Sequence, residues 1–576
     1  MKLILKYTWR YKRYLLLSMM GVVGFVLIQM GMPTLLKYIV NDALLGDKPE
    51  QLGRIALLML VIVFAGMVGE ICMSYANSRI ASNVIRDIRS DMFRKTQSFS
   101  HAEFDQFSVS ALLTSTTSDS YQIFLFVQAM LRSAIITPVM TVTGVILILT
   151  NNPQMFGAIM IALPIVGFCV FFISKASRVY SKGQQAALDH INLNLREGLS
   201  GLRVIRAFGN EAFQTGRFEA VNEEYCGVSK RVFRITALGS PLFFLVFNIM
   251  VGAVLVMGSH AIGQGTLDVG TLHASTEYVF HILFSFLMMA ILFIMYPRAA
   301  VSAARIQSVL DSMPSIAENL EHGVTETVEK GTIRFENVTF SYKGADEPVL
   351  RNISFTAEKG QTVAFIGGTG SGKSTLVQLI PRMYDVTEGR VLVDGVDVRD
   401  YNIHALRQKI GFIPQKAQLF TGTIAENLRL GAPDASQEDL ERAAEIAQAA
   451  DIVSQKEGGY NAVLQEGGSN LSGGQRQRLA IARAIVKRPE LYIFDDSFSA
   501  LDYMTDLKLR TRLRQEIADA TVLIVAQRIG TIRYADKIIV LNEGEIVAEG
   551  RHEQLLDTCG IYYDIAVSQL SEEELA

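Results

Sequence analysis

The chain has 576 residues, of which 49% are hydrophobic and 19% are charged, and its formal net charge is −3 at pH 7. This composition excludes a disordered chain, a coiled coil and a disulfide-rich secreted scaffold. Residues 1–300 carry 25 basic and 17 acidic side chains, whereas residues 301–576 carry 29 and 40, so we expect a charge-poor membrane part followed by a water-soluble part.

The first half contains six apolar segments, each close to the roughly 20 residues that an α-helix needs to cross a bilayer. The third segment is interrupted by Arg132. The first follows a cluster of five basic residues, but its apolar run is too long for a signal peptide and lacks a small-residue cleavage site. We therefore predict a transmembrane domain over residues 1–311 with six retained spans, near residues 14–40, 55–76, 123–150, 155–174, 241–262 and 271–296.

Basic residues predict how these spans are oriented. Five Lys or Arg precede the first span, five lie between the second and third, and ten lie between the fourth and fifth, while the alternate connections are short and carry few. Because positively charged connections stay in the cytoplasm, both chain termini are predicted to be cytoplasmic. The two long inner connections are too polar to lie in lipid, and we expect them to project into the cytoplasm as helices.

Ionisable side chains inside the predicted spans are a second feature, because an unpaired charge in hydrocarbon is costly. Glu70 and Arg132 are two of them. His273, Glu277 and His281 recur every four residues on one face of the sixth span. The trio predicts a cation or substrate site, a set of metal ligands, or a polar stripe that faces a water-filled cavity or a neighbouring helix.

The second half begins with a helix that leaves the membrane, at residues 299–311, and a polar linker at residues 312–330. Short apolar strands then alternate with helical segments from residue 331 to residue 576. This alternation predicts an α/β domain.

A glycine-rich loop follows one of these strands. Residues 367–374 read Gly-Gly-Thr-Gly-Ser-Gly-Lys-Ser, after an apolar strand and before a helical segment. This is the context of a phosphate-binding loop, in which the glycines let backbone N–H groups close around phosphate at a helix N-terminus. Lys373 is predicted to reach the outer phosphates, and the Ser374 hydroxyl is predicted to bind Mg²⁺.

Two further motifs belong with this loop. A second apolar strand, at residues 491–494, ends in Asp495, as expected of a strand that carries a carboxylate to Mg²⁺. Between the two strands, residues 471–475 read Leu-Ser-Gly-Gly-Gln, directly before a basic helical stretch. Alone this sequence would be a weak turn motif, but its position before a basic helical stretch and Asp495 makes it a specific signal.

Together with the six spans, these motifs resemble those of bacterial ATP-binding-cassette (ABC) exporters in the form of a half-transporter. The resemblance covers essentially the whole chain and implies a membrane all-α six-helix transmembrane domain followed by an α/β P-loop NTPase domain. It also implies ATP and Mg²⁺ as cofactors, a second half-transporter as partner, the bacterial cytoplasmic membrane as location, and amphipathic drugs or lipids as substrates, with no nucleic acid involved. The residues it assigns to nucleotide binding are Tyr342, Gly367, Gly368, Thr369, Gly370, Ser371, Gly372, Lys373, Ser374, Thr375, Gln415, Asp495, Ser472, Gly473, Gly474 and Gln475, with Ser374, Gln415 and Asp495 also assigned to Mg²⁺.

The resemblance gives roles to other segments as well. Tyr342 matches the aromatic residue that stacks on adenine, and Gln415 matches the glutamine that senses Mg²⁺ and the membrane domain. Residues 467–470 resemble the loop that links the cassettes, and residues 499–502 resemble the loop that crosses to the second cassette. In the second inner connection, a short helix near residues 209–213 would dock on the partner's cassette.

Two catalytic positions depart from the family pattern. Where the family has a glutamate that polarises the attacking water, this chain has Asp496, whose carboxylate is withdrawn by about 1 Å. Where the family has a switch histidine, this chain has Gln527, which can hydrogen-bond phosphate but holds no transferable proton. Because general-base catalysis contributes roughly 10²–10⁴-fold, we expect a site that binds ATP and hydrolyses it slowly.

This combination resembles the hydrolysis-impaired subunit of a heterodimeric exporter. In that family each ATP lies between the phosphate loop of one chain and the signature of the other, so residues 472–475 would complete an active site on the partner. Two alternatives stay open: a homodimer in which Asp496 works slowly, and a non-pumping regulatory or channel subunit that ATP gates.

Overall fold

The computed structural model describes residues 1–570 except residues 47, 152, 154–155 and 317. The chain groups into two compact units by its internal contacts. The helical unit comprises Met1–Ser98 and Phe107–Ser312, and the α/β unit comprises Phe99–Gln106 and Met313–Ala576.

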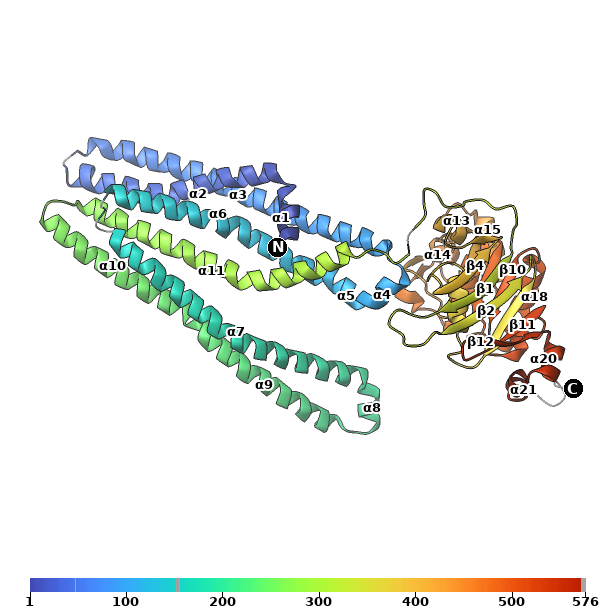
Figure 1. The fold of residues 1–576 in the computed structure, drawn as a ribbon. Coiled ribbons are helices and arrows are strands. Elements are labelled where there is room, and N and C mark those ends of the chain that lie inside the picture. The colour runs from blue at the N-terminus through green and yellow to red at the C-terminus, as the bar shows by residue number, and fades with distance from the viewer. Residues whose placement is uncertain (47, 152, 154–155, 317, 571–576) are drawn as a thin grey trace. The chain divides into compact units, whose positions relative to one another are not determined.

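The helical unit is built from long helices joined by short connections (Figure 1). Its helices are α1 (Lys2–Trp9), α2 (Lys12–Tyr38), α3 (Glu50–Gln97), α5 (Val109–Thr114), α6 (Ser120–Asn151), α7 (Phe156–Ser200), α8 (Leu202–Ala207), α9 (Glu211–Ala237), α10 (Gly239–Gly263) and α11 (Val269–Asp311). The 48 residues of α3 make a helix about 72 Å long, more than twice the roughly 30 Å hydrocarbon core of a bilayer. With 45 and 43 residues, α7 and α11 also exceed that thickness, so all three helices extend well beyond a membrane.

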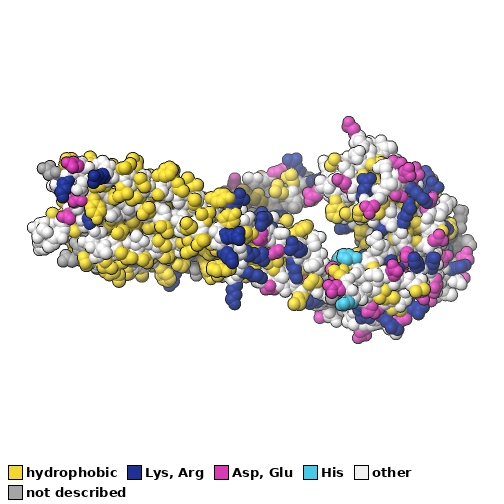
Figure 2. All heavy atoms as spheres, turned by 90° about the horizontal axis from the view of Figure 1, so that it is seen from above, with side chains coloured by type: hydrophobic (Ala, Val, Ile, Leu, Met, Phe, Trp, Pro, Cys, Tyr) yellow, Lys and Arg dark blue, Asp and Glu magenta, His cyan; other side chains and the backbone are white. Residues whose placement is uncertain are grey.

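Five continuous helical segments among the described residues are long and apolar enough to span a membrane: Lys12–Leu44, Glu50–Gln97, Val109–Asn151, Glu211–Gly263 and Val269–Asp311. The predicted fourth span falls in α7 from Phe156 onward, while Met155 lies outside the described residues. Hydrophobic side chains cover much of the outer face of the helical unit (Figure 2). An apolar outer face is what contact with lipid requires.

Helices α2 and α3 approach each other through glycines. A Cβ atom on Gly21 would lie 2.5 Å from the carbonyl oxygen of Gly69, and a Cβ atom on Gly66 would collide with the Ile28 side chain. These positions therefore need glycine, as small residues let helix backbones pack closely in a membrane. Buried side chains of α2, α3, α6, α10 and α11 form the core of the unit, with Tyr278 of α11 fully buried in it.

The second inner connection consists of α7 and α9, which run side by side, with α8 between their ends (Figure 1). The prediction of a short helix at residues 209–213 is wrong. The short helix is α8, and it ends before Gly209, whose φ of +60° is a left-handed conformation that breaks a helix. The exposed side chain of Phe208 lies in the turn, and α9 begins at Glu211.

The described residues of the α/β unit form three sheets. Its strands are β1 (Ile333–Phe340), β2 (Leu350–Ala357), β3 (Thr362–Gly367), β4 (Glu388–Val393), β5 (Val396–Asp397), β6 (Ile410–Ile413), β7 (Gly422–Thr423), β8 (Val463–Leu464), β9 (Leu491–Asp495), β10 (Thr521–Val525), β11 (Lys537–Asn542) and β12 (Glu545–Gly550). Its helices are α4 (His101–Phe107, whose last residue groups with the helical unit), α12 (Lys373–Leu379), α13 (Ile403–Gln408), α14 (Ile424–Arg429), α15 (Gln437–Ile446), α16 (Ala450–Ser454), α17 (Gly473–Val486), α18 (Tyr503–Glu516), α19 (Ile529–Ile532), α20 (His552–Thr558) and α21 (Gly560–Val567).

The central sheet has the strand order β12-β11-β3-β10-β9-β6. All neighbouring pairs are parallel except β11 with β12, which are antiparallel. A second, antiparallel sheet has the order β2-β1-β4-β5, and β7 pairs with β8. A parallel sheet brings the carboxyl ends of its strands to one edge, which is where ligands bind in open α/β folds.

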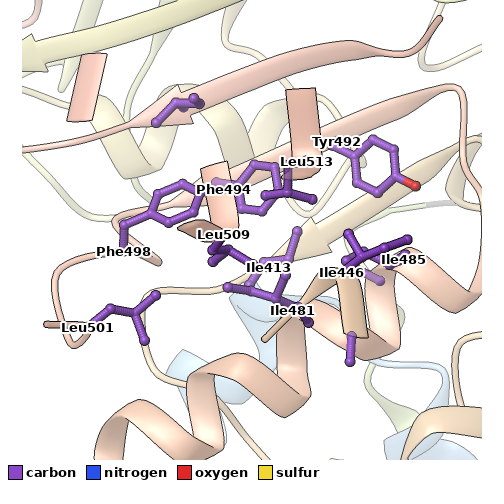
Figure 3. Close-up of a cluster of buried hydrophobic side chains, with 14 of the residues drawn as sticks. Ile413, Ile446, Ile481, Ile485, Tyr492, Phe494, Phe498, Leu501, Leu509 and Leu513 are labelled. Carbon is purple, nitrogen blue, oxygen red and sulfur yellow. The ribbon is translucent and has the colours of Figure 1, made fainter. Parts of the chain in front are cut away.

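Two apolar cores hold the sheets and helices of this unit together. In the larger one, Phe494 of β9 and Ile413 of β6 pack against Ile481 of α17 and Leu509 of α18 (Figure 3). All four side chains are buried. This core anchors the strand that ends in Asp495 to the helix that follows the Leu-Ser-Gly-Gly-Gln motif. The predicted fold class, a helical transmembrane domain followed by an α/β nucleotide-binding domain, agrees with both units.

The short helix α4, from the first inner connection, packs within the α/β unit rather than within the helical one. The Glu103 carboxylate accepts hydrogen bonds from the backbone N–H groups of Ser100, at 2.9 Å, and Ser315, at 3.0 Å. Burial alone would raise the pKa of Glu103, but these hydrogen bonds outweigh it and lower that pKa. The His101 ring lies 5.6 Å from the ring of Tyr384, so α4 is held on the α/β unit by both polar and aromatic contacts.

Candidate nucleotide-binding site

The glycine-rich loop connects β3 to α12. Gly370 and Gly372 have φ values of +85° and +91°, which favour glycine. At Gly372 a Cβ atom would lie 2.6 Å from the Leu350 side chain, so glycine is also required there for space. The loop is therefore tightly curved and leaves its backbone N–H groups available to bind an anion.

Lys373, the first residue of α12, folds its side chain back over this loop. Its Nζ donates hydrogen bonds to the carbonyl oxygens of Gly367, at 2.9 Å, and Gly368, at 2.7 Å. Burial lowers the pKa of Lys373, while the charges of Asp496 and Asp495 oppose that change. The lysine is thus positioned at the concave face of the loop as a point charge for phosphate.

Ser374 and Asp495 meet directly, although 121 residues separate them in the chain. The Ser374 hydroxyl donates a hydrogen bond of 2.7 Å to the Asp495 carboxylate. Burial raises the pKa of Asp495, and the Ser374 hydrogen bond opposes this. A hydroxyl and a carboxylate are the hard oxygen ligands that Mg²⁺ prefers, so these two residues fit the predicted metal, which would neutralise charge on bound phosphates.

Asp496 is held by two glutamine side chains. Nε2 of Gln415 and Nε2 of Gln527 both donate hydrogen bonds to the same carboxylate oxygen of Asp496, at 3.2 Å and 3.0 Å. The backbone of Asp496 is left-handed, with φ of +48°, and its N–H donates to the carbonyl oxygen of Val525 on β10. Burial raises the pKa of Asp496, which the hydrogen bond from Gln415 partly offsets. Gln415, Asp496 and Gln527, which the sequence analysis identified separately, therefore meet at one carboxylate oxygen of Asp496.

Tyr342 lies in a small aromatic cluster beside the loop. Its ring centroid is 4.9 Å from that of Phe340 and 5.3 Å from that of Tyr384. Its hydroxyl shares a hydrogen bond of 2.9 Å with the Thr375 hydroxyl. The neighbours fix the orientation of Tyr342, as a platform for a nucleobase requires.

The Leu-Ser-Gly-Gly-Gln motif forms the start of α17. The Ser472 hydroxyl accepts a hydrogen bond from the backbone N–H of Gln475, at 3.2 Å, and the Gln475 side chain accepts one from the backbone N–H of Ser472, at 2.9 Å. This reciprocal capping box explains why serine and glutamine stand three residues apart. Among the described residues, no hydrogen bond joins these two side chains to the phosphate loop, so the chain presents the motif apart from its own nucleotide site.

Gln569 contacts the candidate nucleotide-binding site at Gln527, and the sequence analysis did not identify it. Its side chain accepts a hydrogen bond from the backbone N–H of Ile529, at 2.9 Å, and donates one to the carbonyl oxygen of Gln527, at 2.8 Å. Gln569 follows α21 near the end of the chain. No sequence motif identifies Gln569, because it comes close to Gln527 only when the chain folds.

We expect Gln569→Ala to loosen this loop, because a neutral hydrogen bond contributes about 0.5–1.5 kcal/mol. Amide hydrogen exchange at Ile529 should become about two- to tenfold faster. Ser568→Ala is the matched control, since the Ser568 hydroxyl donates a hydrogen bond to the carbonyl oxygen of Ile565 and to no other residue that the structure describes. Unchanged exchange at Ile529 in Gln569→Ala would show that Gln569 does not restrain the loop.

The intramembrane residues are arranged in pairs. The guanidinium of Arg132 lies 3.8 Å from the Glu70 carboxylate, and His281 Nε2 lies 3.9 Å from the Glu277 carboxylate. His273 is exposed on the same helix. Among the described residues, no three His, Cys, Asp or Glu side chains are grouped to hold a metal ion, so the trio is not assembled as a set of metal ligands.

Comparison with known proteins is consistent with this geometry. Residues 15–287 match the ABC transporter transmembrane region, and residues 350–499 match the ABC transporter family of nucleotide-binding domains. An uncharacterized ABC transporter ATP-binding protein of Mycobacterium tuberculosis is 39% identical over 97% of this chain and 96% of its own length. An ATP-dependent lipid A-core flippase of Vibrio vulnificus is 30% identical over 94% of this chain and 92% of its own length.

A solved structure shares the fold. A bacterial Atm1-family ABC exporter with ATP bound superposes with a TM-score of 0.83 at 23% identity, over 97% of this chain and 99% of that one. The transmembrane match, the cassette match and the full-length relatives all lead to the same family. The chain therefore belongs to the ABC transporter family, as an exporter half-transporter with a transmembrane domain and a nucleotide-binding domain.

Proposed function

We propose that this chain is the hydrolysis-impaired subunit of a heterodimeric exporter that moves amphipathic molecules, lipids among them, out of the inner leaflet of a bacterial cytoplasmic membrane. In this proposal residues 1–311 form the transmembrane domain, residues 312–330 the linker and residues 331–576 the ABC domain. The observation that carries the proposal is the Asp496 carboxylate, which two glutamine amides hold at one oxygen atom.

A general base must accept a proton from the attacking water within hydrogen-bond reach. Two N–H donors on one oxygen of Asp496 compete with that water for the carboxylate. The side chain is also one methylene shorter than glutamate, and a misplacement of about 1 Å can cost about 100-fold in rate. Gln527 adds no proton that could be exchanged with phosphate. Slow hydrolysis at this site follows from all three features.

The groups that bind nucleotide are intact beside this weakened shell. The curved loop, Lys373 and the hydrogen-bonded pair of Ser374 and Asp495 would supply the phosphate and Mg²⁺ contacts, and Tyr342 would supply an aromatic face. ATP held here would act mainly as a ligand that keeps two cassettes together. The intact motif at residues 472–475 would complete the catalytic site on the partner, where most hydrolysis would occur.

The substrate class is proposed from the membrane half. The many exposed hydrophobic side chains of the helical unit (Figure 2) suit a carrier whose substrate enters from lipid. A relative named as an ATP-dependent lipid A-core flippase aligns with this chain over 92% of its own length. In the second inner connection, the exposed Phe208 and Phe213 beside α8 are candidates to dock on the partner's cassette.

Turnover by the chain alone tests the proposal. Reconstituted by itself in phosphatidylcholine vesicles, the chain should bind ATP but release phosphate at least about tenfold more slowly than the complex with its partner. Lys373→Ala, which removes the phosphate contact, controls for binding. Brisk phosphate release in proportion to the amount of this chain would contradict the heterodimer and favour a homodimer.

A second arm separates a pump from an ATP-gated channel. Inside-out vesicles that contain the complex should accumulate a fluorescent amphiphile against its gradient only when ATP is present. Equilibration without accumulation would mean that ATP gates a passive path, and the export function would then be rejected.

A further inference from the structure

The helical unit contains a cavity of about 260 Å³ between α2, α6 and α11. Most of its lining is apolar, with Phe25 from α2, Met140 from α6, and Phe280 and Phe284 from α11. Arg132 is its only formally charged side chain among the described residues. An apolar pocket with one placed cation is the arrangement expected for a ligand that carries an apolar tail and an anionic head.

The depth of these residues follows from helix geometry. Arg132 lies 18 residues before the predicted outer end of its span, at residue 150, and Glu70 lies 15 residues after the predicted outer end of its span, at residue 55. At 1.5 Å per residue they lie about 27 Å and about 22 Å from those ends, in the inner part of a hydrocarbon core about 30 Å thick. Met140 lies about 15 Å from the same end as Arg132. The cavity therefore runs from Arg132, in the inner part of the membrane, toward the middle of the membrane.

Arg132 is not committed to its carboxylate neighbour. Its Nη2 lies 3.8 Å from Glu70, beyond hydrogen-bond distance, and the two side chains are 62% and 44% exposed. A guanidinium has five N–H donors that bind carboxylate or phosphate in a planar, two-point manner. The side chain thus keeps its donors for a ligand, while Glu70 supplies a weak counter-charge when no ligand is bound.

The other polar groups of the cavity divide into two kinds. Thr137 donates to the carbonyl oxygen of Ser285, and the Ser285 hydroxyl donates to that of Ile282, so both hydroxyl protons are used inside the helices. Gln29 has no hydrogen bond to any described residue. Ser133 and His281 also line the cavity, and His281 Nε2 lies 3.9 Å from the Glu277 carboxylate. The polar groups that can face a ligand beside Arg132 are therefore Gln29, Ser133 and His281, while Phe25, Phe280 and Phe284 supply most of the apolar wall.

We propose that this cavity binds an amphiphile with an anionic head group, a phosphate monoester or a carboxylate on an alkyl chain. Arg132 binds the head in exchange for Glu70, and the Phe25, Phe280 and Phe284 side chains contact the chain. At about 260 Å³ the cavity is smaller than most sites for whole drug-sized ligands, which start near 300 Å³, so it takes one chain segment. The biological meaning of this inference rests on the proposed export function, but binding of the amphiphile by the cavity does not depend on that function.

The test measures binding without ATP, in the complete transporter embedded in phosphatidylcholine nanodiscs. Dodecyl phosphate is the probe, and dodecylphosphocholine has the same chain with a zwitterionic head. Arg132→Gln should weaken dodecyl phosphate binding at least about tenfold, since charge-assisted hydrogen bonds are lost. Binding of dodecylphosphocholine should change less than about twofold. Arg132→Lys should have an affinity between those of the unchanged chain and Arg132→Gln, because it keeps the charge but loses the planar pair of donors.

Two further variants keep the proposal testable if Arg132→Gln does not fold. Glu70→Gln removes the competing carboxylate and should tighten dodecyl phosphate binding several-fold, although the arginine is untouched. Arg79→Gln is the matched control, since Arg79 lies on α3 over the Tyr75 ring and outside the cavity. It should change neither affinity.

Each outcome bears on the inference. Equal losses for both dodecyl probes in Arg132→Gln, or no loss for either, would mean that Arg132 anchors the helix at the interface and binds no head group. Competition by inorganic phosphate as strong as that by dodecyl phosphate would show a free-anion site and contradict the amphiphile. Intact probe binding in a complex that fails to accumulate substrate would reject the export function and leave this site standing.

Discussion

The double variant Asp496→Glu with Gln527→His is expected to hydrolyse ATP about ten- to a hundredfold faster than the unchanged chain, in a complex whose partner has an intact signature motif. Glutamate extends the carboxylate by about 1 Å toward the attacking water. Histidine removes one of the two amide donors from that carboxylate and supplies a group that titrates near neutral pH. Steady-state phosphate release measures the gain in kcat.

Each single change should achieve less than the pair. With Asp496→Glu alone, the amide of Gln527 still competes for the carboxylate, and with Gln527→His alone the base is still too short. Adding Lys373→Ala to the double variant should abolish the gain, because phosphate binding is lost. A double variant that gains nothing beside an intact partner signature would show that these two positions do not limit turnover.

Ser472→Ala is expected to lower the ATP turnover of the complex about 10²-fold, although Ser472 has no hydrogen bond to the phosphate loop of its own chain among the described residues. In the proposed heterodimer this hydroxyl and the start of α17 complete the partner's site, and removing one donor aimed at a transition state costs about 10²–10³-fold. Part of the loss comes from the capping box, which contributes about 1 kcal/mol to α17.

Ser436→Ala controls for this second variant. Ser436 caps α15 as Ser472 caps α17: its hydroxyl accepts a hydrogen bond of 3.2 Å from the backbone N–H of Asp439, whose side chain accepts one of 3.1 Å from the backbone N–H of Ser436. Its replacement should change turnover less than about twofold. If Ser472→Ala had as little effect, the motif of this chain would not complete a working site. Melting temperatures of both variants separate the capping contribution from the catalytic one.

The phosphate loop and the Mg²⁺ pair were accessible from the sequence because their determinants are local. A strand, a run of glycines and a helix start follow one another over residues 362–379, and each needs only its neighbours. The meeting of Ser374 with Asp495 was also foreseeable. Both follow parallel strands of one sheet, with β10 between them, and the carboxyl ends of such strands share an edge.

The ends of short helices and the contacts between remote segments were harder to predict from the sequence. The family resemblance implied a short helix near residues 209–213, whereas the helix lies at Leu202–Ala207. The left-handed backbone at Gly209 decides this, and a glycine in a polar stretch can equally continue a turn or end a helix. In the same way, nothing local to Glu103 predicted that its carboxylate binds the backbone of Ser315, 212 residues away.

The sequence by itself determined the class of the protein, and it predicted the spans, their orientation and the residues that bind nucleotide. These depend on composition, periodicity and motifs, which act over short stretches of chain. Only the tertiary structure decided that Gln415 and Gln527 share one oxygen of Asp496, that Gln569 holds the switch loop, and that Arg132 opens into an apolar cavity. Each of these depends on distances between residues remote in the chain, which are set by how strands and helices pack. The net charge of −3 is the sum of a basic membrane half and an acidic nucleotide-binding half. Packing within each half assembles the site that we propose for it.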